Sequence, residues 1–234
     1  MEPPVLTISS LGGTEDAPVP VHLSASDAAS TSTAGVVVKV MTFPAGSTFS
    51  RGTFDDNIWT FNSADFGDAE LTLPQHLSGE ITLGATATKA GATREGTARI
   101  PVQAIADPPN LSVGDICYDP AVGSVNLPVQ SSLVDDDGSE TLSVLIAGIP
   151  ENVTLSVGQR NGSNEYTLSA QDIANVQIQF TGRFQPINVT ITAQSRELMN
   201  GDTAYASSSV SIELCSQSGR SCTVHNLYYW QHAA

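Results

Sequence analysis

An internal repeat is the feature that most constrains the fold of this chain. Leu6–Ser9 reappears 105 residues later as Leu111–Gly114, and Trp59–Phe61 reappears 107 residues later as Tyr166–Leu168. A spacing that drifts so little over more than a hundred residues indicates two copies of one domain, with small loop insertions between them. Tandem copies of a small unit are typical of proteins that provide reach, spacing or multivalent binding.

The composition predicts that each copy is all-β. The 234 residues include 19 Gly and 13 Pro, which punctuate short segments rich in Val, Ile, Thr and Ser. About seven such segments per copy are typical of an immunoglobulin-like Greek-key β-sandwich. Trp59 and Tyr166 share one repeat position, and we interpret both as core anchors. The predicted strands are 6–9, 19–24, 35–42, 58–62, 70–73, 79–88 and 97–104 in the first copy, and 111–113, 124–129, 140–147, 164–169, 176–180, 187–195 and 207–214 in the second.

The alignment of the two copies also predicts the domain boundaries. Ala106–Leu111 matches Met1–Leu6, so the chain opens on the same kind of linker that joins the copies. Two prolines stiffen this linker toward an extended conformation. We therefore predict a first domain at 1–107, a second at 108–215 and an unassigned tail at 216–234. We also expect the chain to be a segment of a longer array.

The charge balance narrows the classes of partner. The chain carries 24 acidic and 9 basic residues, a net charge of −15. Nucleic acids and anionic membrane surfaces both require clustered Lys and Arg, so neither is an expected partner. No apolar stretch approaches the roughly 18 residues of a membrane-spanning helix, so we expect no direct membrane insertion. The acidic excess indicates either solubility through self-repulsion or the binding of a hard cation such as Ca²⁺, which prefers carboxylate oxygens.

Sequons and cysteines are compatible with an exported protein, and we expect an extracellular or cell-surface location. Four N-x-S/T sequons begin at Asn110, Asn152, Asn161 and Asn188, which fits a glycoprotein without establishing one. Cys117, Cys215 and Cys222 can form one bridge at most. Pairing of Cys215 with Cys117 and pairing of Cys215 with Cys222 are about equally plausible from the sequence.

Several short motifs in the chain belong together. The most specific is Asp135–Val144, D-D-D-G-S-E-T-L-S-V, which is followed by Ile149-Pro150 and Thr154–Ser156. The other pieces are Thr14–Asp16, Trp59–Phe61, Ala64–Phe66, Gly84–Thr88 and the linker Ala106–Pro109. Together these motifs resemble the repeat of large bacterial surface adhesins and RTX-type exoproteins, and the resemblance covers residues 1 to about 215 in two passes. It implies cadherin-like sandwiches, rigidified by Ca²⁺, that act as extension modules of an adhesin.

The strongest candidate site is the acidic loop of the second copy. Asp135, Asp137 and Glu140 fall at positions i, i+2 and i+5, and Gly138 permits the turn that would bring their oxygens together. The alternative is a solvated acidic turn. The first copy has Ser26–Ser32 in the same place, with a single carboxylate, so we expect the two copies to bind metal unequally.

Two further sets of carboxylates are candidate Ca²⁺ ligands. Asp107 precedes the linker prolines, and Asp115 and Asp119 follow in the second copy, which would suit an ion at the junction of the copies. Its alternative is a linker that is merely acidic. Glu15 and Asp16 match the opening of the resembling repeats, and their alternative is a solvated turn.

Catalysis finds little support in the sequence. The four histidines are scattered, and neither a G-x-S-x-G elbow nor an H-E-x-x-H motif is present. Asp65 and Asp172 recur at one repeat position, about a hundred residues apart, and we predict that each caps a turn after the Trp59 or Tyr166 strand. We therefore predict that the chain is not an enzyme.

The favoured function is a spacer or stalk segment of a cell-surface adhesin, stiffened by Ca²⁺, whose partners are the neighbouring repeats of the same chain. One alternative is a sandwich that recognises a glycan or protein on a cell surface, although an aromatic content of 6% counts against a sugar-stacking face. Another alternative is a structural module without a metal.

Overall fold

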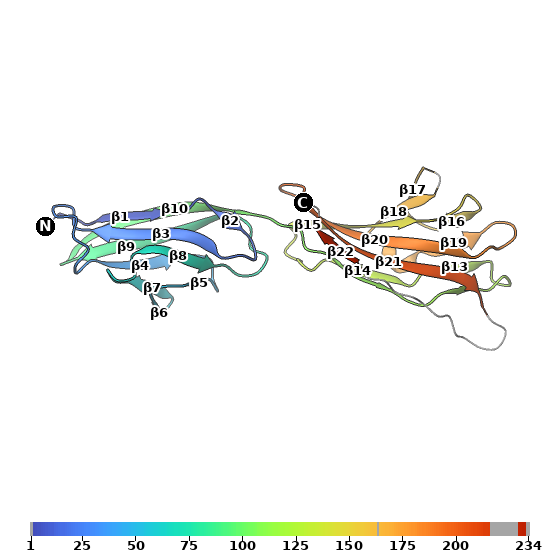
Figure 1. Ribbon diagram of the computed structural model, residues 1–234, viewed down its shortest axis with the longest axis horizontal. Helices are drawn as coiled ribbons and strands as arrows, with labels where there is room; N and C mark the ends of the chain where they lie inside the picture. The colour runs from blue at the N-terminus through green and yellow to red at the C-terminus, as the bar shows by residue number, and fades with distance from the viewer. Residues whose placement is uncertain (1, 163, 216–228, 233–234) are drawn as a thin grey trace. The chain divides into compact units, whose positions relative to one another are not determined.

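The computed structural model of the chain describes residues 2–162, 164–215 and 229–232 (Figure 1). The chain divides into two compact units, Met1–Ile105 and Ala106–Ala234, which we call unit 1 and unit 2. Both units are built from β-strands, and the described residues include one short 3₁₀ helix, η1 (Ile173–Asn175). No helix within these ranges is long and apolar enough to cross a membrane.

Unit 1 is a sandwich of two sheets. One sheet has the strand order β1-β3-β8-β5, and the other has the order β2-β10-β9-β4-β7-β6. The chain changes sheets at its start, because β1 pairs antiparallel with β3 whereas β2 runs parallel to β10. The strands are β1 (Val5–Ser9), β2 (Gly13–Thr14), β3 (Val19–Ser26), β4 (Val37–Thr42), β5 (Thr48–Phe49), β6 (Thr53–Asp55), β7 (Ile58–Phe61), β8 (Gly67–Thr72), β9 (Gly79–Lys89) and β10 (Ala92–Gln103).

The core of unit 1 follows from the alternation of its strands. Successive side chains of a strand point to opposite faces, and in β3 the apolar members Val19, Val21 and Leu23 are buried while their neighbours are mostly exposed. Trp59 packs edge-on against Phe49 with ring centroids 5.5 Å apart. Trp59 is 8% exposed, which confirms its predicted role as a core anchor.

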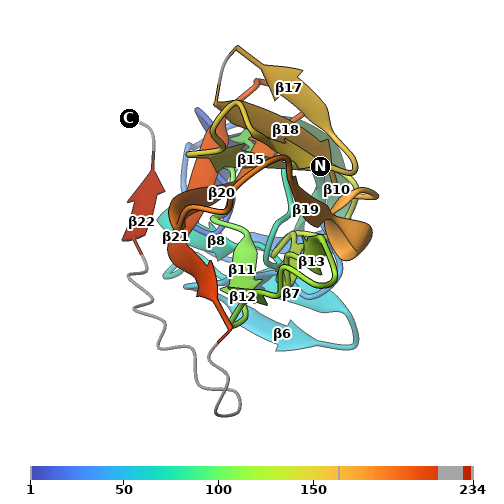
Figure 2. The ribbon, with the colours of Figure 1, turned by 90° about the vertical axis from the view of Figure 1, so that its right-hand side faces the viewer.

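Unit 2 has the same plan (Figure 2). Its larger sheet has the order β12-β21-β20-β15-β18-β17, with β22 also paired to β21. It faces a two-stranded sheet, β11-β14, and a three-stranded sheet, β13-β19-β16. Here too β11 pairs with β14 while β12 runs parallel to β21. The strands are β11 (Asn110–Val113), β12 (Cys117–Tyr118), β13 (Ser124–Asn126), β14 (Val129–Ser132), β15 (Glu140–Ala147), β16 (Val153–Leu155), β17 (Gln159–Asn161), β18 (Glu165–Ser169), β19 (Gln177–Phe180), β20 (Ile187–Glu197), β21 (Thr203–Leu214) and β22 (Tyr229–His232). The predicted fold, two tandem immunoglobulin-like Greek-key sandwiches, is confirmed.

One predicted strand of unit 2 is interrupted. The sequence predicts a continuous strand at 124–129, but β13 ends at Asn126 and β14 begins at Val129. Proline has no N–H to donate to a ladder, so Pro128 ends the pairing with β19 that β13 makes. In unit 1 the equivalent strand β3 contains no such break.

The structure resolves the cysteine pairing that the sequence left open. Cys117 and Cys215 form a disulfide, with Cα atoms 5.0 Å apart. The parallel pairing of β12 with the end of β21 brings them together, because Cys117 lies opposite Glu213. Cys222, the alternative partner, lies outside the described residues.

The two recurring aspartates cap turns, as predicted. Asp65 accepts a hydrogen bond of 2.8 Å from the Asn62 N–H, and Asp172 accepts one of 3.1 Å from the Ser169 N–H. Each carboxylate thereby closes the turn that follows the strand of the aromatic anchor.

Candidate metal centre

The acidic loop of unit 2 is held by its own carboxylates. Asp135 accepts hydrogen bonds from the Asp137 N–H at 3.0 Å and from the Ser139 hydroxyl at 3.1 Å. Asp137 in turn accepts the Ser139 N–H at 2.7 Å. Gly138 adopts a φ of 95°, which a residue with a side chain would rarely adopt. These bonds fold the loop so that Asp135 is 3% exposed although its neighbour Asp137 faces solvent.

Two buried glutamates lie directly opposite each other next to this loop. Glu140, the first residue of β15, is the cross-strand partner of Glu197, the last residue of β20. Glu140 is 6% exposed and Glu197 is 1% exposed. Opposite residues of an antiparallel pair have Cβ atoms about 5 Å apart, and like charges in that position destabilise the sheet.

Backbone contacts join the first residues of unit 2 to the glutamate pair. Glu140 accepts the Asp107 N–H at 3.0 Å, and the Ser195 hydroxyl donates to the Asp107 carbonyl at 2.5 Å. Asp202 accepts the Ala106 N–H at 3.0 Å. Residues 106 and 107 are therefore anchored to the strand ends that carry Glu140 and Glu197.

The hairpin between β20 and β21 completes this end of unit 2. Its turn is closed by hydrogen bonds from the Glu197 N–H to the Asp202 carbonyl at 2.9 Å and from the Gly201 N–H to the Glu197 carbonyl at 3.0 Å. The Leu198 N–H donates to the Ser139 carbonyl at 2.9 Å, which ties the hairpin to the acidic loop. We call Asp107, Asp135, Glu140, Glu197 and Asp202 the carboxylate cluster.

Sequence reasoning placed three members of the carboxylate cluster among the candidates and missed two. Asp107, Asp135 and Glu140 were predicted, and Asp137 borders the cluster as an exposed residue of its loop. Glu197 and Asp202 were missed. The feature that could have indicated these two residues is the longer connection between the last two long strands of the second copy, β20 and β21. In unit 1 the chain turns from β9 to β10 over two residues only.

Asp115 and Asp119 do not join Asp107. Asp119 accepts the Ala121 N–H at 2.9 Å and caps a turn directly after β12. β12 pairs with the last residues of β21, whereas Asp202 immediately precedes the first, so Asp119 lies at the opposite end of unit 2. Asp115 is exposed and lies just before β12, on the other side of this short strand from Asp119.

Glu15 and Asp16 lie in unit 1 and have structural contacts there. Glu15 is 4% exposed, accepts the Ile105 N–H at 2.5 Å and donates its own N–H to the Gln103 carbonyl at 3.0 Å. Asp16 adopts a φ of 56° and accepts the His76 N–H at 3.0 Å. The imidazole Nδ1 of His76 lies 3.4 Å from the Asp16 carboxylate. Glu15 thus fastens the end of β10.

Unit 1 has an ion pair where unit 2 has its acidic loop. Asp27 follows β3, accepts the N–H groups of Ala29 and Ser30, and lies 2.9 Å from the Lys89 Nζ at the end of β9. The Lys89 ammonium and these N–H groups lower the pKa of Asp27 from 3.8 to about 2. In unit 1 the protein itself therefore supplies the cation that neutralises the single carboxylate.

Replacing Lys89 with methionine is expected to raise the pKa of Asp27 toward 3.8, because the largest cause of its depression is removed. Since the folded pKa lies below the ordinary value, the ion pair stabilises unit 1 above pH 3.8, and that contribution is lost as the pH falls toward about 2. Carboxyl carbon chemical shifts in an NMR titration measure the midpoint. A midpoint near 2 in Lys89→Met would contradict the assignment, and Lys39→Met, which changes an exposed lysine of β4, is the matched control.

The chemistry of the carboxylate cluster suits a hard divalent cation. Its side-chain donors are carboxylate oxygens, which favour Ca²⁺ over zinc or copper. A cation between Glu140 and Glu197 would be attracted by both carboxylates. The type of ligand that these residues offer is therefore the type that a calcium ion prefers.

Comparisons with known proteins give a likeness in structure alone. No protein-family model matches the chain, and neither does any curated protein. Among solved structures, an I-band fragment of titin is 14% identical, with a TM-score of 0.34 and coverage of 92% of this chain and 66% of the fragment. Three N-terminal domains of the outer capsid protein Hoc of bacteriophage RB49 are 11% identical, with a TM-score of 0.36 and coverage of 92% and 71%. A mutant of Salmonella alpha-2-macroglobulin is 14% identical, with a TM-score of 0.34 and coverage of 91% and 16%.

The strand order of each unit defines the class of protein, a tandem immunoglobulin-like β-sandwich.

Proposed function

We propose that the chain is a non-catalytic spacer segment of a cell-surface adhesin and that Ca²⁺ stiffens unit 2. The observation that carries the proposal is the buried pair of Glu140 and Glu197 on adjacent strands. Buried carboxylates on adjacent strand ends offer the charged oxygen ligands that Ca²⁺ prefers.

The ligands proposed for the ion are Glu140, Glu197, Asp135 and Asp202, with Asp107 as an additional member. They come from three segments of unit 2: its first residues, the acidic loop with the start of β15, and the hairpin between β20 and β21. An ion held by all three would fix residues 106 and 107 against the strand ends, because Glu140 and Ser195 already bind the backbone of Asp107. Stiffening the start of a unit is what a spacer needs.

An extracellular location and a role as spacer are supported by three features. The two units repeat one architecture, unit 2 contains a disulfide, and disulfides persist mainly in oxidising compartments. The adhesin-like motif Asp135–Val144 contributes two of the proposed ligands. Asp65 and Asp172, the carboxylates that recur in both units, are used in turn caps, which supports a non-catalytic role. The neighbouring repeats of a longer chain would be the constant partners.

Thermal unfolding of the full chain in Ca²⁺ and in chelator tests the proposal. A ligand that binds only the folded state stabilises it by about 2.7 kcal/mol at a concentration 100 times its Kd. For a unit of roughly a hundred residues this corresponds to a rise in Tm of about 10 °C. Calcium is expected to raise the unfolding transition of unit 2 and to leave that of unit 1 unchanged, with hydrogen exchange read on peptides from each unit.

Magnesium is the control for a general effect of divalent charge. Mg²⁺ gives up its water reluctantly and requires octahedral geometry, so it is expected to stabilise unit 2 less than Ca²⁺ at the same concentration. An unchanged transition of unit 2 at millimolar Ca²⁺ would refute calcium binding. Equal shifts in both units would indicate screening of the acidic surface rather than a site.

A further inference from the structure

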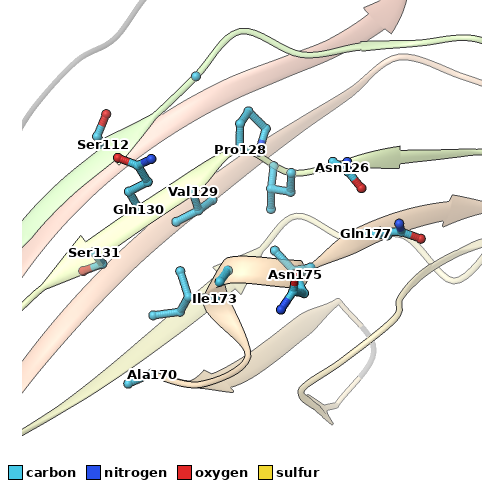
Figure 3. A pocket seen from close by; sticks show the side chains of 14 residues that line it. Ser112, Asn126, Pro128, Val129, Gln130, Ser131, Ala170, Ile173, Asn175 and Gln177 are labelled. Carbon is cyan, nitrogen blue, oxygen red and sulfur yellow. The ribbon is translucent and has the colours of Figure 1, made fainter.

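Unit 2 contains a groove of about 720 Å³ between β14 and η1 (Figure 3). One side is formed by the segment from Asn126 to Ser131, and the other by Ile173 and its neighbours up to Gln177. The groove adjoins the break that Pro128 makes between β13 and β14. Unlike the carboxylate cluster, the groove is lined by residues without ionisable side chains.

The side of β14 that faces away from β11 has no strand partner among the described residues. The Gly114 N–H donates to the Pro128 carbonyl at 2.8 Å, and this bond sets the alternation of the β11–β14 ladder. Rungs alternate between hydrogen-bonded and non-hydrogen-bonded pairs, so Gln130 and Ser132 exchange bonds with β11. The backbone groups of Val129 and Ser131 therefore point the other way, toward the groove.

Within the described residues, three of these backbone groups remain available for a new strand. The Val129 N–H already donates to the Leu127 carbonyl at 2.9 Å. The Val129 carbonyl and both the N–H and the carbonyl of Ser131 are the groups directed at the groove. An extended peptide opposite Ser131 would exchange two hydrogen bonds with it, and its next inward-facing N–H would reach Val129.

The charges in and around the groove define the peptide that suits it. The lining offers carboxamides, hydroxyls and aliphatic side chains, among them Asn126, Asn175 and Gln177, so a charged side chain would find no opposite charge inside. Outside, Asp115 follows the lining residue Gly114, and Asp172 precedes the lining residue Ile173. A peptide that is uncharged within the groove and basic at its ends is complementary to this pattern.

We infer that the groove binds an extended peptide of another protein by strand addition to β14, with uncharged residues in the groove and basic residues at the ends. The lining contains no aromatic side chain on which a sugar ring could stack, which favours a peptide over a glycan. This binding is independent of the proposed spacer function and of the carboxylate cluster. Because β14 is four residues long, the binding is weak and reversible.

The test uses the full chain and a synthetic peptide of alternating threonine and valine with a lysine at each end. NMR titration is expected to shift the amide signals of Val129–Ser132 and of η1, and to leave unit 1 unchanged. The Ser131→Pro variant removes the N–H that faces the groove while sparing the rungs to β11. It is expected to weaken binding about ten-fold, the effect of losing one hydrogen bond.

Ser131→Ala is the matched control. It loses the bond of 2.8 Å from the Ser131 hydroxyl to the Asn110 carbonyl but keeps the backbone N–H, so it is expected to bind the peptide like the unmodified chain. A peptide with every amide N-methylated is expected not to bind, and this measurement decides the question if Ser131→Pro does not fold. Equal binding of the methylated peptide overturns the inference.

Two other occupants of the groove are outcomes that would also overturn the inference. If a neutral oligosaccharide shifts the same amides and the peptide does not, the groove is a glycan site. If the chain alone forms dimers in sedimentation that Ser131→Pro abolishes, the occupant is a second copy of β14.

Discussion

Removing the Cys117–Cys215 disulfide is expected to destabilise unit 2 by about 4 kcal/mol and to leave unit 1 unchanged. The two cysteines are 98 residues apart, so the bridge closes a loop that contains nearly all of the described part of unit 2. In the chain-entropy account, cross-linking a loop of about 100 residues restricts the unfolded chain by the equivalent of about 4.7 kcal/mol. Native disulfides of small extracellular domains contribute about 2–5 kcal/mol by measurement.

The double variant Cys117→Ser/Cys215→Ser tests this expectation, because a single replacement would leave Cys215 or Cys117 able to pair with Cys222. Chemical denaturation followed by hydrogen exchange on peptides of each unit gives the two free energies of unfolding separately. Cys222→Ser is the matched control, since it removes a cysteine and keeps the bridge. A double variant whose unit 2 unfolds at the same denaturant concentration as the control would show that the bridge contributes no stability.

Local patterns in the sequence predicted the parts of the fold that local interactions determine. The strand expected at 140–147 is β15, and its alternation of apolar residues is enough to define it. Trp59 and Tyr166 are buried anchors because each alternates with a second apolar residue on one face, Phe61 or Leu168. Because the repeat aligns the two copies, a strand assigned in one copy could also be assigned in the other. The architecture of both copies was therefore predictable.

Pairings between distant segments were not predictable in the same way. The disulfide depends on β12 lying beside the end of β21, and nothing near Cys117 in the sequence indicates that neighbour. Likewise Glu197 faces Glu140 only because β20 pairs with β15 in one particular register. A shift of that register by one residue would turn Glu197 to the other face of the sheet.

The same limitation explains the grouping of Asp119 with Asp107. The two residues are 12 positions apart in the sequence, and the sequence therefore suggested one site. The intervening strand β11 carries the chain away from Asp107, and β12 then pairs with the final residues of β21. Asp107 and Asp119 are close in sequence but distant in space because a strand lies between them.

Replacing Glu197 with glutamine is expected to reduce the stabilisation that unit 2 gains from Ca²⁺. The variant keeps the size of the side chain but loses a charged ligand of the proposed ion. Most of the stabilisation of about 2.7 kcal/mol expected from the ion at 100 times its Kd should therefore be lost. The quantity compared is the shift in Tm that Ca²⁺ produces in each protein, so an effect of the substitution on the calcium-free protein does not enter the comparison.

Glu213→Gln, at an exposed position near the end of β21, removes the same charge from unit 2 and is expected to keep the full shift in Tm that Ca²⁺ produces. Thermal unfolding with and without Ca²⁺ measures all three proteins. If Ca²⁺ shifts the Tm of unit 2 equally in Glu197→Gln and in the unmodified chain, Glu197 is not a ligand. If Glu213→Gln loses the shift as well, the effect comes from the net charge of unit 2 rather than from a site.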